Sequence, residues 1–331
     1  MMIGITQFLP QNIPPPNAAG LAIYDGDNKT CGVDFGRMYP ADTGDYLYRI
    51  GKISDSHLQP ESSYGAAYAK QLDDALAWLK RQGAAMVCHC GDVTDHGFYY
   101  SNKTLDLNQF GQYKKIREKY PDMPIYAALG NHDSYFGDYT VAANRELLIE
   151  YAGHDVHHTV AKGGDLYIFC GQTVNYLPMS YDTVTWLEST LSNNTDKRCF
   201  VFCHPYIGSD DSGNPLGLAG NPLWNGWAYS NRVQAALRNH PRAMLFHGHS
   251  HARPENQFAD LRTNYSEALG FPSFHIPSSA YCRRVVDGVW KEFQKQSVIY
   301  LADVYERAVV LRAYDVVEGK YVAIGQYCIK F

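Results

Sequence analysis

Short apolar runs alternate with amphipathic segments along most of the chain after residue 46. The runs predict β-strands at residues 48–53, 84–90, 125–129, 165–170, 199–203 and 243–246. Residues 64–82, 107–120, 182–191 and 231–239 have the period of amphipathic helices, and Asp182 or Thr183 is the expected cap of the third. Strands that alternate with helices favour an α/β architecture.

The two ends of the chain follow a different pattern. The proline-rich N-terminus leads to the apolar stretch 21–24, an Asp-Gly-Asp-Asn turn and a return strand that ends near Phe35. We therefore expect residues 1–45 to form an appendage with a small β-hairpin, and residues 46–331 to form the main domain. Within that domain, three alternating stretches near the C-terminus predict further strands, at residues 297–303, 308–314 and 321–331.

Composition and charge narrow the possible partners. The 331 residues are 45% hydrophobic, which is enough for a sizeable core and typical of a soluble globular protein. The net charge of −5 makes binding along an extended nucleic acid an unattractive main function. Any affinity for phosphate should therefore come from a single local site and not from the charge of the whole surface.

Neither a signal peptide nor a membrane span is expected from the sequence. The N-terminus lacks a basic leader with a long apolar core, and no window approaches the length of a bilayer-spanning segment. Most of the 8 cysteines lie in apolar runs, where buried free thiols are more common than disulfides. These features predict a cytoplasmic location.

Residue types that bind metals follow several of the predicted strands. They occur in five places, which are Asp55-Ser56-His57, Gly91-Asp92-Val93-Thr94-Asp95, Gly130-Asn131-His132-Asp133, His204 and Gly248-His249-Ser250-His251. Open α/β sheets form their sites beyond the carboxyl ends of strands, so these side chains can share one crevice. Carboxylate, amide and imidazole donors suit manganese, iron and zinc alike, and the carboxylate of Asp92 can bridge two cations.

Together, the five blocks resemble the calcineurin-like metallophosphoesterases, in the order that this family has them. The resemblance covers roughly residues 46–285 and implies a four-layer α/β/β/α sandwich, with two central mixed sheets flanked by helices. The strands after residue 297 would complete or cover it. The metal site would lie at the C-terminal strand ends.

The resemblance also implies two transition-metal ions (manganese, iron or zinc) and a role for each block. One metal would be bound by Asp55, His57, Asp92 and His251, and the other by Asp92, Asn131, His204 and His249. A water or hydroxide between the metals would attack phosphorus in line. His132 would stabilise the phosphoryl oxygens or protonate the leaving oxygen, with Asp95 orienting its ring.

Other histidines and aromatic residues leave alternatives open. His96 adjoins Asp95 and either contacts substrate or lies in an ordinary loop. Tyr206 begins a long loop with Trp224 and Trp227, whose rings either stack on a flat leaving group or anchor the loop. For His154, His157 and His158 we expect a solvated loop, and for Cys88-His89-Cys90 packing within the sheet.

The function expected from the resemblance is hydrolysis of a phosphate monoester or diester. We favour a small, nucleotide-derived diester, because the aromatic loop could hold a base. A phosphoprotein phosphatase is the enzymatic alternative. The alternative outside the enzymes is a non-catalytic binding or assembly module that docks a protein through residues 1–45.

Overall fold

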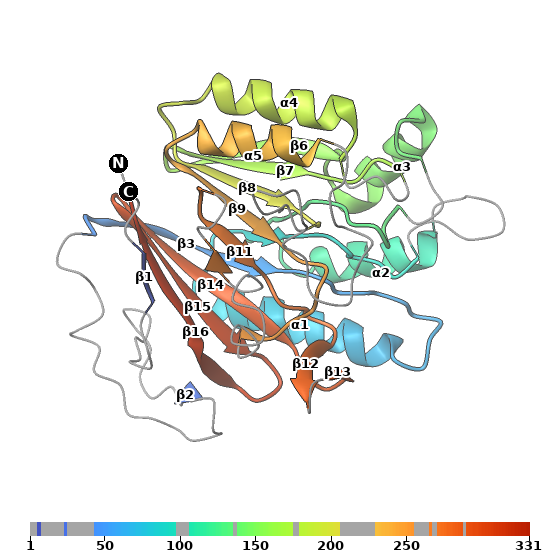
Figure 1. Ribbon diagram of the computed structural model, residues 1–331. Coiled ribbons are helices and arrows are strands. Elements are labelled where there is room, and N and C mark those ends of the chain that lie inside the picture. Colours follow the sequence, from blue (N-terminus) through green and yellow to red (C-terminus); the bar gives the residue numbers. More distant parts are fainter. Residues whose placement is uncertain are drawn as a thin grey trace.

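The computed structural model (Figure 1) is built on two β-sheets that face each other. It describes residues 5–7, 23–24, 43–96, 106–134, 138–174, 179–205, 229–254, 265–266, 270–286 and 289–331. Five helices of this described part lie on the outer faces of the two sheets (Figure 1). The predicted four-layer α/β/β/α sandwich is confirmed.

The first sheet joins parallel strands from the early part of the chain to antiparallel strands from its end. Its strand order is β1-β16-β15-β14-β3-β4-β5, with β2 also paired to β16. Strands β3, β4 and β5 are parallel, and β14 joins them antiparallel to β3. The bounds are β1 Ile5–Gln7, β2 Ile23–Tyr24, β3 Tyr46–Ile53, β4 Val87–His89, β5 Ile125–Ala127, β14 Val298–Tyr305, β15 Ala308–Asp315 and β16 Lys320–Lys330.

The second sheet has the order β10-β11-β9-β8-β7-β6. Its four central strands are parallel, whereas β6 and β10 pair antiparallel at the two edges. The bounds are β6 His157–Lys162, β7 Asp165–Cys170, β8 Cys199–Cys203, β9 Ala243–His247, β10 Tyr265–Ser266 and β11 Ser273–His275. A separate two-stranded hairpin follows, formed by β12 (Cys282–Val286) and β13 (Val289–Phe293).

Helices cover the outer face of each sheet because their apolar sides complete the two outer cores. Apolar residues of α1 (Gly65–Arg81), α2 (Leu107–Arg117) and α3 (Ala142–Ala152) share a buried cluster with the first sheet. Residues of α4 (Tyr181–Ser192) and α5 (Ser230–Arg238) do the same with the second sheet. Burial of this apolar area is the main force that holds the helices in place.

The central core lies between the sheets. Strand alternation directs Tyr48 and Ile50 of β3 into it, together with Phe200 and Phe246 of the second sheet. Lys52 continues the inward-facing series of β3 and lies over the ring of Phe246, with Nζ 3.0 Å from the centroid. A charged side chain in the middle of an apolar core is unusual.

The two short strands described within residues 1–45 add to the edge of the first sheet. Ile5–Gln7 pairs antiparallel with β16, and Ile23–Tyr24 pairs in parallel with its start. The return strand expected near Phe35 lies outside the described residues. The boundary at residue 45 therefore stays a prediction, but β16 is a partner that the hairpin hypothesis did not anticipate.

The expectation of a solvated loop around the second histidine group is wrong. His154 is 8% exposed, and its Nε2 accepts a hydrogen bond from the backbone N–H of Ala127. His157 and His158 belong to β6, whose antiparallel pairing with β7 makes it a strand despite its polar sequence. The helix cap of α4 also differs from expectation, because Ser180 takes that position.

Two expectations about the chemistry of the chain can be compared with the described residues. The seven cysteines among them, Cys88, Cys90, Cys170, Cys199, Cys203, Cys282 and Cys328, are buried free thiols, as predicted. None of the helices in the described ranges has the length and apolarity that crossing a membrane requires.

Candidate metal centre

The predicted metal ligands of both sheets meet at one edge of the sandwich. Asp55 and His57 follow β3, Asp92 follows β4, Asn131 follows β5, and His204 follows β8. His249 and His251 come from the loop after β9, and the backbone N–H of His249 donates to the carboxylate of Asp55 at 3.1 Å. This hydrogen bond ties the last block of the series to the first.

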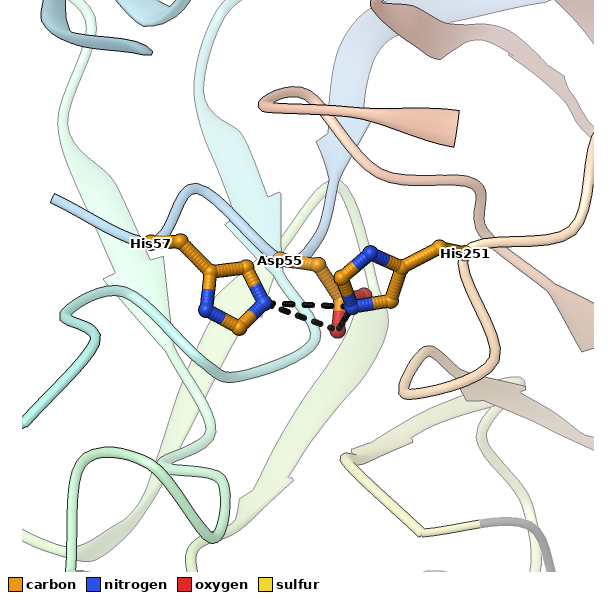
Figure 2. Close-up of side chains that lie close together, drawn as sticks. All are labelled: Asp55, His57 and His251. Atoms are coloured by element: carbon orange, nitrogen blue, oxygen red, sulfur yellow. Dashed lines mark hydrogen bonds and ion pairs between the residues drawn. The ribbon is translucent and has the colours of Figure 1, made fainter. Parts of the chain in front are cut away.

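One group of donors consists of Asp55, His57 and His251 (Figure 2). Nε2 of His57 lies 3.1 Å from Nε2 of His251, and the latter lies 3.1 Å from Oδ1 of Asp55. All three side chains are buried. Donor atoms from three separate positions therefore converge on one small volume.

A second group of donors lies beside the first. Nε2 of His204 is 2.9 Å from Oδ2 of Asp92 and 3.2 Å from Nδ1 of His249. Oδ2 of Asp92 is also 3.9 Å from Nε2 of His57. Asp92 thus lies between the two groups, where a bridging carboxylate would have to be.

Hydrogen bonds on the outer side of two rings set which nitrogen faces inward. Nδ1–H of His251 donates to the carbonyl of Tyr281 at 3.2 Å, and Nδ1–H of His204 donates to the carbonyl of Cys90 at 3.0 Å. Because a carbonyl oxygen can only accept, the neutral forms of both rings present the lone pair of Nε2 to the centre. Histidines that bind metals are held in the same way.

The side-chain oxygen of Asn131 supports the presence of a cation. This residue is only 9% exposed, and its Oδ1 has no hydrogen-bond partner among the described residues. A buried amide oxygen without a partner loses its hydration and gains nothing in return. Coordination of a cation would supply the missing interaction, so the residues present fit a metal centre.

The backbone is strained at most of the candidate metal ligands. Among the described residues other than glycine, only six have positive φ, and five of them are Asp55, His57, Asp92, His249 and His251. Such conformations cost free energy and persist where function or the surrounding structure requires them. The strain is therefore concentrated on the candidate ligands.

Two glycines make the close packing of this edge possible. Gly91 has φ of +105°, and a Cβ there would lie 2.7 Å from Cβ of His204. A Cβ on Gly130 would overlap the side chain of Asp92. Residues without a side chain are needed here because the loops of the two sheets approach each other directly.

Electrostatics within the cluster keeps some of its histidines protonated. Burial disfavours the charge of His204, but Asp92 and Asp55 outweigh it and raise the pKa of this imidazole to about 9. Burial lowers the pKa of His251 to about 4, despite its contact with Asp55. Since a bound metal needs a neutral imidazole, cation binding must displace a proton from His204.

Asp95 has a different set of contacts from the one expected. Its Oδ1 lies 3.0 Å from Nδ1 of His57, and its Oδ2 lies 2.9 Å from Nδ1 of His96. Nδ1 of His132 instead donates to the backbone carbonyl of Asp95 at 2.7 Å, whereas its distance to the carboxylate is 3.6 Å. Asp95 therefore contacts His132 through its backbone, and its carboxylate holds His57 and His96.

Several of the remaining expectations lie outside the described residues. This applies to Tyr206, Trp224 and Trp227. His96 is described, and its side chain is 32% exposed. Its ring centroid lies 6.3 Å from that of His132.

The structure also identifies two supporting residues to which sequence reasoning assigned no role. Asp133 is fully buried and accepts hydrogen bonds from the backbone N–H groups of Val93, Thr94 and Gly130. Gln109 of α2 accepts from the loop that carries Asp95. Asp133 was visible as part of its block, but no sequence signal connected Gln109 with the centre.

The chain is similar to one protein family and to several solved structures. The family model described as calcineurin-like phosphoesterase matches residues 48–253. A dimetal phosphatase from Danio rerio has a TM-score of 0.59 and 13% identity, over 87% of this chain and 100% of that one. GAP50, the anchor in the inner membrane complex of Plasmodium, has a TM-score of 0.55 and 12% identity, over 87% of this chain and 90% of that one.

These two structures are too distant in sequence to show more than a common fold. The comparison with curated proteins found no match. The family model, by contrast, extends over more than half of the chain and includes the ligand-bearing loops after β3, β4, β5, β8 and β9. The chain therefore belongs to the calcineurin-like phosphoesterase family.

Proposed function

We propose that this protein is a metal-dependent phosphoesterase that hydrolyses a phosphate monoester or diester. The observation that carries the proposal is the pair of neighbouring donor groups, which are Asp55-His57-His251 and Asp92-His204-His249, with Asp92 also 3.9 Å from His57 of the first group. The proposed ligands of one cation are Asp55, His57, Asp92 and His251, and those of the other are Asp92, Asn131, His204 and His249. The donor set suits manganese, iron or zinc.

The two cations would supply Lewis acidity toward the phosphoryl oxygens and lower the pKa of a water molecule. The chain's own contribution begins with His132. Its Nδ1–H is held by the carbonyl of Asp95, so the other ring nitrogen is the one available to substrate. Burial lowers the pKa of His132, so that its imidazolium form, with Nε2 protonated, would be a stronger acid toward a leaving oxygen than an ordinary imidazolium.

Asp95 holds the rings of His57 and His132 in place. Burial acts against its charge, but hydrogen bonds from His57 and His96 hold its pKa well below the usual range. The ionised carboxylate keeps the ring of His57 in one orientation, and the carbonyl of the same residue does so for His132. We assign His132 a catalytic role and Asp95 a positioning role.

The substrate that we favour is a small diester derived from a nucleotide, with His96 contacting it beyond His132. The side chain of His96 is partly exposed, which makes it accessible from this side of the centre. Tyr206, Trp224 and Trp227 remain proposed contacts for a flat leaving group. A phosphoprotein phosphatase is the enzymatic alternative.

A non-catalytic assembly module, docking through residues 1–45, is the alternative from another class. The observation that favours this alternative is the similarity in fold to GAP50, which is described as an anchor. The presence of all seven proposed ligands favours hydrolysis, because an assembly surface has no need of converging, strained and buried donors.

A substrate panel on manganese-loaded protein tests the proposal. We expect turnover of p-nitrophenyl phosphate, bis-p-nitrophenyl phosphate or cyclic nucleotides, with the diesters fastest. Asp92→Asn should cut turnover by orders of magnitude while the fold persists, and Asp74→Asn, on the exposed side of α1, should have no effect. Absence of turnover together with far less than one metal per chain would refute the enzyme and favour the assembly module.

A further inference from the structure

Gln109 lies outside every block of metal-type residues, yet it contacts the centre's supporting loop. It is the third residue of α2 and is fully buried. Its Oε1 accepts hydrogen bonds from two successive backbone N–H groups, those of Asp95 at 3.1 Å and His96 at 2.8 Å. One buried oxygen thus holds the turn on which Asp95 sits.

Three histidine rings depend on the orientation of that turn. The carboxylate of Asp95 holds His57 and His96, and its carbonyl holds His132. A small rotation of this one residue would move all three contacts at once. The orientation of Asp95 therefore influences how the rings of His57 and His132 are turned toward the candidate centre.

Two further contacts fix Gln109 itself. Its backbone N–H donates to the side chain of Asp106, the N-cap of α2, at 3.2 Å. Its Nε2 donates to Oε1 of Glu61 at 2.5 Å, which connects α2 to the segment between β3 and α1. The carboxamide can therefore adopt only one orientation, since Glu61 accepts and the two backbone N–H groups donate.

We propose that Gln109, fixed by Glu61, is a positioning residue that sets the orientation of Asp95 and, through it, the rings of His57 and His132. The inference rests on the proposed function for its effect on turnover. Its effect on metal affinity does not depend on that function. Loss of a group that supports metal-binding side chains commonly lowers affinity or activity by about 10- to 100-fold.

An exchange of the two side chains tests the proposal. Gln109→Glu removes the donor to Glu61 and places two carboxylates together, so we expect zinc affinity and kcat to fall by about 10- to 100-fold. The double variant Gln109→Glu with Glu61→Gln restores a donor and acceptor pair with reversed direction. It should recover most of both losses, with little change in KM in either protein.

Gln112→Met is the matched control, one turn further along α2 and without a hydrogen-bond partner for its Oε1 among the described residues. It should leave zinc affinity and kcat unchanged. If Gln109→Glu does not fold, Glu61→Ala at its exposed position replaces it, with an expected loss of zinc affinity of about tenfold.

Zinc titration calorimetry separates the two proposals. Wild-type protein that binds zinc without hydrolysing any ester would refute the hydrolase and leave the positioning role measurable through affinity. An active wild type whose Gln109→Glu variant folds and keeps its zinc affinity and kcat would overturn the positioning role. A folded double variant as impaired as the single one would do the same.

Discussion

Lys52 shows how far a single residue can depart from its usual behaviour in this protein. Its side chain is fully buried between the sheets, and its Nζ has no hydrogen-bond partner among the described residues. Burial lowers the pKa of Lys52 to about 7, although Cys88 and Cys90 act in the opposite direction. Among the described residues, contacts with the faces of Phe200, Phe202 and Phe246 offset part of the lost hydration.

Replacement of Lys52 by methionine should stabilise the protein at neutral pH. Because the pKa of Lys52 is lower in the folded than in the unfolded chain, the unfolded chain binds more protons from about pH 7 to about pH 10.4. The free energy of unfolding contributed by this residue therefore rises with pH across that window, and the cost of burying it is largest at pH 7 and below. We expect Lys52→Met to raise the free energy of unfolding at pH 7 by on the order of 4 kcal/mol.

Denaturant unfolding of both proteins in chelator, from pH 7 to pH 10, measures this effect. The difference between the two proteins is the relevant quantity, because His204 has a pKa of about 9 and titrates in both. The stabilisation should shrink as the pH rises. Lys70→Met, at a position whose side chain is 72% exposed, is the control and should give a small difference at every pH. A constant difference for Lys52→Met would contradict the buried-charge explanation.

At the scale of elements, helix starts and strand ends determine where side chains point. The sequence placed the cap of α4 at Asp182 or Thr183, but the side chain of Ser180 accepts the hydrogen bond from the backbone N–H of Thr183. Several polar residues in succession can each cap a helix, and local sequence does not choose among them.

Ser180→Ala should destabilise the protein by about 1 kcal/mol, because it leaves the N–H of Thr183 without its partner. Asp182→Asn keeps the side-chain size and removes only a favourable charge near the helix start, so we expect a few tenths of a kcal/mol. Thermal and denaturant unfolding of the two variants provide the comparison. A loss for Ser180→Ala no larger than that for Asp182→Asn would contradict the assignment of the cap to Ser180.

At the scale of the whole molecule, the candidate centre joins the two sheets. The first sheet supplies Asp55, His57, Asp92 and Asn131, and the second supplies His204, His249 and His251. Neither sheet has enough donors for both cations. A bound cation would therefore link the two halves of the sandwich and stabilise the fold as a whole.

Cations should raise the stability of the protein through this link. Since a ligand that binds only the folded state stabilises it, zinc or manganese at 100 times the dissociation constant should add about 2.7 kcal/mol to the free energy of unfolding. His204→Ala should remove most of this gain, whereas His157→Ala on β6, away from the centre, should retain it. Chelator titrations followed by thermal unfolding measure both. Equal gains in the two variants would show that the cations bind elsewhere.

Much of the architecture could be predicted from local patterns. The strands Asp165–Cys170 and Cys199–Cys203 have the predicted bounds, and four helices occur where the period indicated them. Helix α3 was missed, as were the strands β1, β6 and β10 to β13. These strands are short or polar, and strands such as β6 form because a neighbour offers its backbone groups, a condition that no local pattern records.

The sequence by itself determined which residue types could bind metals and that each follows a strand, because periodicity and residue chemistry are local properties. Only the tertiary structure decided how they combine. It placed Asp92 close to both donor groups, and it joined Asp95 to His57 by its carboxylate and to His132 by its carbonyl. It also brought Gln109 to the loop of Asp95 and Lys52 into the central core. Those facts depend on distances between residues far apart in the chain. Such distances arise from the pairing of strands within a sheet and from the packing of helices and sheets against each other, which local sequence patterns do not record.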